Sequence, residues 1–416
     1  MNVILSSILG AVLFGAASLS TAGEPDIMTR NQHRGAVGEI DVMTQNQYLG
    51  ADLAPLLEAA TSGGPFDPMA FNNALVESLT KIAASRPAER ARALAEEIAR
   101  RKPDVVGLQE AYTFECASIP GVQLPPDTGC HDPLIKDAFT DHLQDTEAAL
   151  REKYVVAGRV TNLKVGPIQF LVNGFPALLS VADRDAILVR TGLPVQRVNF
   201  ACSAPSDDGC HYLTRPSDLV LGDIKIALVR GFLAVDVTVK DRQYRLFNTH
   251  LEQRLLAPNL PETRLLQVGQ AKELLSTALA TWSRWDGLSK TVIIVGDINS
   301  DPRDPKITLP NGQQVMTPYQ IFTSNGFTDV WTLRPHPKPG LTCCQEEDLT
   351  NGRSELYERI DMIFSLTPPS HVMDVKLLGN RKRDKTDPPP HGGLWPSDHA
   401  ALAATLKFKD WGAHTS

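Results

Sequence analysis

The sequence lacks a surplus of positive charge. Its 416 residues contain 41 Lys and Arg against 48 Asp and Glu, so the formal net charge is −7. A broad basic face for nucleic acid is therefore not implied, although a local basic patch is compatible with this balance. Hydrophobic residues make up 42% of the chain and charged residues 21%, a composition typical of a soluble globular protein.

Long apolar runs are also missing beyond the N-terminus, since none approaches the roughly 20 residues that span a bilayer. The N-terminus differs, because residues 3–17 are largely apolar and small residues at 20–22 precede Gly23. This pattern predicts a signal peptide over 1–22 and a secreted or periplasmic protein. No Lys or Arg precedes the apolar run, so a membrane anchor is the alternative, but the run is short for a spanning helix.

Internal repeats, low-complexity segments and an interdomain linker are absent from the sequence. The length suits one large domain or two ordinary ones. The chemistry-bearing motifs described below lie between positions 46 and 399, so a single site needs almost the whole chain. We therefore expect a loose polar leader over 23–38 and one catalytic domain over 39–410.

Six cysteines fit an exported protein. Two pairs flank short loops and are predicted disulfides: Cys116 with Cys130, and Cys202 with Cys210. The adjacent Cys343 and Cys344 leave three alternatives open, namely a vicinal disulfide, two free thiols or metal ligands. A zinc site is disfavoured because no His or Cys lies nearby at ligand spacing.

Apolar runs alternate with amphipathic stretches, which predicts a mixture of strands and helices. The predicted strands are 40–44, 105–108, 154–160, 184–190, 230–239, 243–249, 292–295, 359–365 and 400–408. The predicted helices are 73–84, 88–101, 137–151, 264–281 and 318–325, and a long loop is expected over 112–135.

Polar side chains follow two of these strands. Asn46 comes after the first strand, and Glu110 follows the strand 105–108. An amide oxygen and a carboxylate suit a hard cation such as Mg²⁺, which keeps several waters for a substrate phosphate. Taken alone, each residue also fits a turn Asn or a solvated Glu at a strand end.

Two further strand ends carry polar groups. Asp297 and Asn299 lie two apart, so both point to one face if the strand continues, and together they could orient a water and hold a phosphoryl oxygen. His250 ends the strand 243–249, with Asn248 on the same face. The alternatives are a turn at 299–304 and a core histidine at 250.

Asp361 lies inside an apolar strand, where a carboxylate is costly unless it is paired. His399, which follows Asp398 shortly before the last strand, is the candidate partner. A carboxylate that holds an imidazole in one tautomer is typical of a catalytic base. A structural pairing of Asp361 with an arginine is the alternative.

The ordered set of motifs resembles the endonuclease/exonuclease/phosphatase superfamily, which includes deoxyribonuclease-like nucleases, abasic-site endonucleases, inositol polyphosphate 5-phosphatases and neutral sphingomyelinases. The matching segments are Gln45–Asn46, Leu108–Glu110, Thr249–Leu251, Gly296–Asn299, Arg359–Asp361 and Ser397–His399. A histidine at position 250 and the predicted export are both typical of the deoxyribonuclease-like and sphingomyelinase-like branches. The chain therefore resembles a secreted, bacterial-type member of these branches. The resemblance implies an α/β (α+β) fold, a four-layer αββα sandwich of two mixed β-sheets flanked by helices.

The resemblance also implies roles. Glu110, helped by Asn46 and Asp398, would hold Mg²⁺, or Mn²⁺ or Ca²⁺ in its place. His399, oriented by Asp361, would deprotonate water. Asp297 and Asn299 would position that water and the phosphoryl group, and His250 would donate to a phosphoryl oxygen or protonate the leaving group.

The expected function is an exported, metal-dependent phosphodiesterase acting on a phospholipid or sphingomyelin head group. The acidic charge favours lipid, as does the apolar run 168–179, a predicted hairpin that could touch a bilayer transiently or be an internal sheet pair. The basic cluster 381–385 suits a nucleic-acid backbone or an anionic head group equally. The alternatives are a secreted non-specific endonuclease acting on DNA or RNA, a phosphomonoesterase and a non-catalytic binder; no obligate protein partner is evident.

Overall fold

The computed structural model describes residues 38–61, 66–222, 224–254, 261–283, 290–336, 338–386 and 393–409. The predicted signal peptide and nearly all of the predicted leader lie outside these residues. The described residues all belong to one unit that spans 36–416. Among the helices of the described residues, none is long and apolar enough to cross a membrane.

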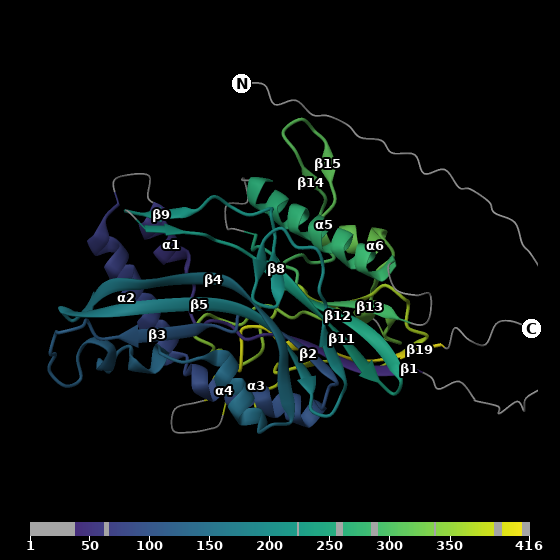
Figure 1. Ribbon diagram of the computed structural model, residues 1–416, viewed down its shortest axis with the longest axis horizontal. Coiled ribbons are helices and arrows are strands. Elements are labelled where there is room, and N and C mark those ends of the chain that lie inside the picture. Colours follow the sequence, from purple (N-terminus) through teal and green to yellow (C-terminus); the bar gives the residue numbers. More distant parts are fainter. Residues whose placement is uncertain are drawn as a thin grey trace, which may run out of the picture. The chain divides into compact units, whose positions relative to one another are not determined.

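The first sheet has seven strands in the order β18-β19-β1-β2-β5-β3, and β4 pairs with β5 (Figure 1). Only the β1–β2 pair is parallel. The strands are β1 (Gly38–Asn46), β2 (Val105–Gln109), β3 (Thr113–Ala117), β4 (Tyr154–Val172), β5 (Phe175–Arg190), β18 (His371–Leu378) and β19 (Ala401–Phe408).

The second sheet has eight strands in the order β16-β17-β13-β12-β11-β8-β7, and β6 pairs with β11. Its one parallel pair is β12–β13. The strands are β6 (Val195–Arg197), β7 (Pro205–Ser206), β8 (Gly209–His211), β11 (Gly231–Val239), β12 (Arg242–His250), β13 (Thr291–Asp297), β16 (Thr328–Asp329) and β17 (Asp361–Ser365). Two small hairpins are separate: β9 (Leu219–Leu221) with β10 (Ile224–Ile226), and β14 (Ile307–Thr308) with β15 (Gln314–Val315).

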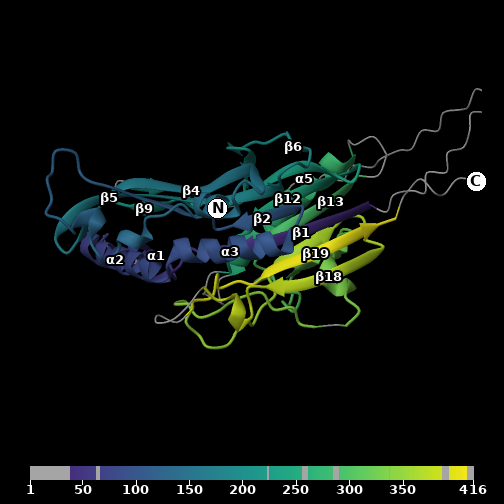
Figure 2. The same ribbon diagram turned by 90° about the horizontal axis from the view of Figure 1, so that it is seen from below.

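Helices cover the outer faces of both sheets. The described residues contain six α-helices: α1 (Ala54–Thr61), α2 (Pro68–Ala84), α3 (Pro87–Arg101), α4 (His142–Leu150), α5 (Pro261–Ser283) and α6 (Pro318–Ser324). Apolar side chains of α3 and α4 pack on the first sheet, and those of α5 and α6 pack on the second. The inner faces of the two sheets share one core, so the predicted four-layer αββα sandwich is confirmed (Figures 1 and 2).

The β4–β5 hairpin is much longer than the predicted strands 154–160 and 184–190. Its turn is Asn173–Gly174, with positive φ at both residues, as a two-residue hairpin requires. Of the apolar run 168–179, Phe170, Val172 and Leu179 are buried in a core cluster that includes residues of α2. The run is therefore a sheet pair whose apolar side chains mostly point inward, and Leu171 is its exposed large hydrophobic residue.

Other elements differ from the sequence prediction in detail. The strand predicted at 359–365 begins only at Asp361, and the helix predicted at 137–151 begins at His142 because Asp141 caps it. The loop predicted over 112–135 contains strand β3. Cys116–Cys130 and Cys202–Cys210 are disulfides as predicted, and Cys343 is bonded to Cys344.

Candidate active site

The polar motifs meet at one edge of the sandwich because of strand direction. The carboxyl ends of the parallel pairs β1–β2 and β12–β13 carry Asn46, Glu110, His250 and Asp297. Strand β17 runs antiparallel to β13 and places its first residue, Asp361, directly opposite Asp297. Strand β19 runs antiparallel to β1, so the segment before it, with Asp398 and His399, reaches the same edge.

Several residues where strands end at this edge have unusual backbone conformations. Gly296 has φ of 142°, and a Cβ there would lie 1.9 Å from the carbonyl oxygen of Thr249, so only glycine fits. Glu110 and Asn299 are non-glycine residues in the left-handed region, with φ of 54° and 48°. Such conformations cost free energy and persist where the surrounding structure fixes them.

The predicted pairing of Asp361 with His399 is present. Asp361 Oδ2 lies 2.7 Å from His399 Nδ1, and the Asp361 side chain is fully buried. Thr342 Oγ1 accepts the backbone N–H of Asp361 at 3.1 Å and fixes the start of the strand. Burial alone would lower the pKa of His399, but the Asp361 and Asp398 carboxylates raise it well above its ordinary value.

Asn46 connects two carboxylates. Its Nδ2 donates to Glu110 Oε1 at 3.0 Å and to Asp297 Oδ2 at 3.1 Å. Its Oδ1 accepts the backbone N–H of Tyr48 at 2.9 Å, and the N–H of Leu49 reaches Glu110 Oε2 at 3.0 Å. The amide oxygen that the sequence offered to a cation accepts this backbone N–H, and the amide nitrogen holds the two carboxylates.

Asp297 lies at the centre of the site. Burial raises its pKa to about 7, repulsion from Asp361 adds to this, and His399 opposes it. The backbone N–H of Asn299 donates to Asp297 Oδ1 at 2.9 Å. The Asn299 side chain donates to the carbonyl oxygen of Leu251, so it is tied to the end of β12.

The carboxylates fit a divalent cation. Asp398 is mostly buried, and burial, with repulsion from Glu110, raises its pKa to about 6 although His399 lowers it. Buried carboxylates that repel one another are the oxygen donors that a hard cation neutralises. Ligand atoms of Asp297, Asp361 and His399 also lie within 4.8 Å of one another, as do those of Cys343, Cys344 and His399.

His250 faces Asp297 from the other side. Its ring is fully buried, and its Nε2 lies 3.5 Å from Asp297 Oδ2. Its Nδ1 lies 3.0 Å from Nη1 of Arg230, the residue before β11. Burial, the Arg230 charge and the His399 charge all hold the pKa of His250 well below its ordinary value.

Sequence reasoning missed a second buried group beside this histidine. Asp183 and Asp185 of β5 are buried, and burial raises the pKa of Asp183 to about 6 and holds that of Asp185 well above its ordinary value. Arg230 lies 3.2 Å from Asp183 and lowers the pKa of both, as does Asn162 of β4. Two aspartates at alternate positions of an apolar strand were a signal in the sequence, whereas Arg230 had none.

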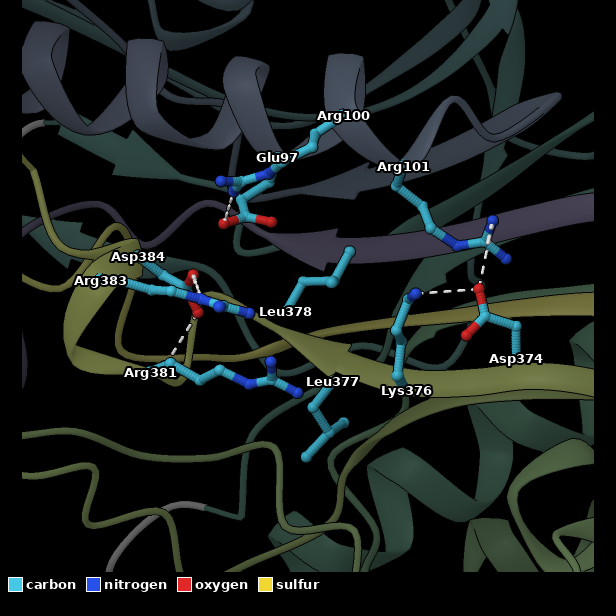
Figure 3. A pocket seen from close by; sticks show the side chains of 10 residues that line it. All are labelled: Glu97, Arg100, Arg101, Asp374, Lys376, Leu377, Leu378, Arg381, Arg383 and Asp384. Carbon is cyan, nitrogen blue, oxygen red and sulfur yellow. Dashed lines mark hydrogen bonds and ion pairs between the residues drawn. The ribbon is translucent and has the colours of Figure 1, made fainter.

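The basic cluster 381–385 lies apart from these residues and lines a pocket of about 470 Å³ with α3 and β18 (Figure 3). Several basic side chains of this pocket have acidic neighbours. Arg100 pairs with Glu97, Lys376 and Arg101 both approach Asp374, and Arg383 approaches Asp384. These carboxylates offset part of the positive charge that the pocket offers to a phosphate backbone.

The chain is similar to known proteins. Residues 73–399 match the model of the Endonuclease/Exonuclease/phosphatase family. A family protein from Bacteroides thetaiotaomicron is 17% identical, over 90% of this chain and 100% of that one, with a TM-score of 0.49. Truncated TDP2 from Caenorhabditis elegans is 15% identical, over 89% of this chain and 97% of that one, with a TM-score of 0.46. The B. thetaiotaomicron mannosyl-6-phosphatase Bt3783 is 17% identical, over 88% of this chain and 98% of that one, with a TM-score of 0.45. No curated relative matches the chain.

Proposed function

The chain belongs to the endonuclease/exonuclease/phosphatase family, whose members hydrolyse phosphoester bonds, and from that premise we propose that it is an exported, metal-dependent phosphodiesterase. The observation that carries the proposal is the buried Asp361–His399 pair, with His399 Nε2 facing Asp297 at 3.9 Å. That pair is an oriented base beside a carboxylate able to hold a water.

In the proposed reaction a water oxygen bonds to phosphorus as the ester P–O bond breaks. Asp361 accepts the Nδ1–H of His399, so the free Nε2 takes one proton from the water. Asp297, held by Asn46 and the Asn299 N–H, aligns the water for attack. The leaving oxygen takes its proton from solvent.

Glu110 and Asp398 are the proposed metal ligands, and Asn46 keeps Glu110 in place. A bound Mg²⁺, Mn²⁺ or Ca²⁺ would supply positive charge to a phosphoryl oxygen as a Lewis acid. The repulsion between the two carboxylates supports this assignment. Export is supported by the apolar segment 3–17 and fits the disulfides of the described residues.

The substrate class is a phosphodiester, which phospholipids and nucleic acids share. The lipid prediction rested on the acidic net charge and on the run 168–179, and the burial of Phe170, Val172 and Leu179 weakens the second of these supports. The acidic neighbours of the basic side chains in the pocket beside 381–385 offset part of the charge that favours nucleic acid. Neither observation separates the two substrates, so the experiment must.

One assay tests the function. Purified protein is given sphingomyelin, phosphatidylcholine, DNA, RNA and a phosphomonoester, each with Mg²⁺ and with a chelator. We expect diester cleavage that the chelator abolishes and that Mg²⁺ restores. Cleavage of the monoester alone, or activity undiminished by chelator, would contradict the proposal, and binding without turnover would favour the non-catalytic alternative.

A further inference from the structure

His250 is held from behind by an arginine. Nη1 of Arg230 lies 3.0 Å from His250 Nδ1, and the same nitrogen lies 3.2 Å from Asp183 Oδ2. Nε of Arg230 lies 3.9 Å from Glu252 Oε1. Two carboxylates, one on β5 and one in the segment after β12, therefore hold the guanidinium against the ring.

This contact decides where the imidazole proton sits. A guanidinium has only N–H donors and stays charged, so His250 Nδ1 must accept, and the single ring proton of a neutral imidazole lies on Nε2. A second proton on Nδ1 would set donor against donor and cation against cation. Burial and the charges of Arg230 and His399 act in the same direction.

The Nε2–H points into the site without a partner. Asp297 Oδ2 is 3.5 Å away, too far for a good hydrogen bond, and among the described residues Nε2 has no other acceptor. A buried donor without an acceptor costs free energy unless a ligand supplies one. A non-bridging phosphoryl oxygen is the acceptor that the proposed reaction brings to this point.

We propose that Arg230 is a positioning residue that holds His250 as a neutral Nε2–H donor to a non-bridging phosphoryl oxygen, and that His250 does not protonate the leaving group. The inference deepens the proposed function and rests on it for the identity of the acceptor. The assignment of the tautomer rests on the geometry alone.

The first test reads the tautomer without any activity. Ring nitrogens of the ¹⁵N-labelled full chain are followed by NMR from about pH 5 to about pH 8, where an unperturbed histidine titrates. His250→Gln identifies the resonances of His250. We expect a protonated Nε2 and an unprotonated Nδ1 throughout. A proton on Nδ1 anywhere in this range overturns the inference.

The charged groups around the His250 ring affect its protonation between these pH values. Arg230, Asp297 of β13 and His399 beside β19 face His250, while Asp183 of β5 and Glu252 after β12 contact Arg230. In Arg230→Met the ring loses its donor, so we expect a second tautomer or a visible titration. Arg184→Met is the matched control, because Arg184 pairs with Asp141 and Thr113 instead.

The second test uses aryl phosphodiesters with leaving groups of increasing acidity. His250→Gln should lower kcat by about 10²-fold, the usual effect of removing one oxyanion donor, and equally across the series. A loss that shrinks as the leaving group improves would show a general acid and overturn the inference.

Arg230→Met should lower kcat about 10-fold with little change in KM, and Arg230→Lys should recover part of it. Full activity in Arg230→Met, together with an unchanged His250 tautomer, would contradict the positioning role. If the protein cleaves no diester, the proposed function fails, whereas the NMR result still decides the tautomer. If Arg230→Met does not fold, the spectra of the unmutated chain decide alone.

Discussion

Two histidines face one carboxylate from opposite sides of the site, and their partners differ in charge. Nε2 of His250 lies 3.5 Å and Nε2 of His399 lies 3.9 Å from the same Asp297 oxygen. Nδ1 of His399 contacts the carboxylate of Asp361, whereas Nδ1 of His250 contacts the guanidinium of Arg230. Both rings are buried, with side-chain exposures of 0% for His250 and 7% for His399, so burial does not account for the difference.

The difference teaches that the group at Nδ1 sets the role of Nε2. A carboxylate accepts a hydrogen bond from Nδ1–H, so the lone pair is on Nε2, which makes a base. An arginine donates a hydrogen bond to the lone pair of Nδ1, so the ring N–H is on Nε2, which makes a donor. The pKa values follow, since that of His399 is raised and that of His250 is lowered.

The largest expected effect comes from removing the base. His399→Ala should reduce turnover by about 10²-fold to 10⁴-fold because no other group accepts the water proton. Steady-state kinetics with Mg²⁺ on a diester measures the loss, and circular dichroism checks the fold. His371→Ala, at an exposed position of β18, is the control and should keep full activity. Retained turnover in His399→Ala would remove this base from the mechanism.

The second prediction changes the group that bonds Nδ1 of His399, so that it resembles the partner of His250. Asp361→Asn keeps the shape but removes the charge, and the amide can donate to Nδ1 as Arg230 does for His250. We expect kcat to fall by about 10²-fold, since the ring would then carry its proton on Nε2. The ¹⁵N spectrum of His399 should show this change of tautomer. An unfolded variant would instead make Asp361 chiefly structural.

The third prediction concerns Asn46, which bonds Asp297, the carboxylate that both histidines face. Asn46→Ala removes the amide between Glu110 and Asp297, so their repulsion is no longer relieved. We expect the Mg²⁺ concentration for half-maximal activity to rise about 10-fold to 100-fold, as for other partners of metal ligands. Activity should return at high Mg²⁺. An unchanged metal requirement would show that Asn46 does not affect the cation site, and Asn72→Ala, on α2 where its side chain bonds Leu171 of the hairpin, is the control.

The sequence predicted the half of the site that obeys a simple rule. A carboxylate inside the apolar run at Asp361 requires a partner, and His399 was the candidate, with an arginine as the alternative. The strand ends at Asn46, Glu110 and Asp297 were equally readable, because apolar runs stop there. The sandwich was implied by the resemblance of these ordered motifs to the family.

The other half depends on contacts that no local pattern contains. Arg230 reaches His250 only because β11 and β12 pair in one register, with Asp183 arriving from the other sheet. The direction of the Asn46 amide is set by the Tyr48 N–H, a feature of the loop that follows the strand. The burial of the run 168–179 depends on α2, which is distant in sequence.

A third histidine isolates the effect of burial from that of a charged partner at Nδ1. His142 is buried at the start of α4, and burial, followed by repulsion from Arg90, lowers its pKa to about 3. Because an unfolded histidine titrates near pH 6.5, the unfolded chain binds this proton first as the pH falls. The free energy of unfolding should therefore decrease between about pH 6.5 and about pH 3, by up to ~1.4 kcal/mol per pH unit from this residue. In urea unfolding, His142→Gln should reduce the dependence of the unfolding free energy on pH, whereas His371→Gln should leave it unchanged. An equal slope in both variants would mean that burial alone does not keep a histidine neutral in this fold. The Arg230 contact would then account for more of the lowered pKa of His250.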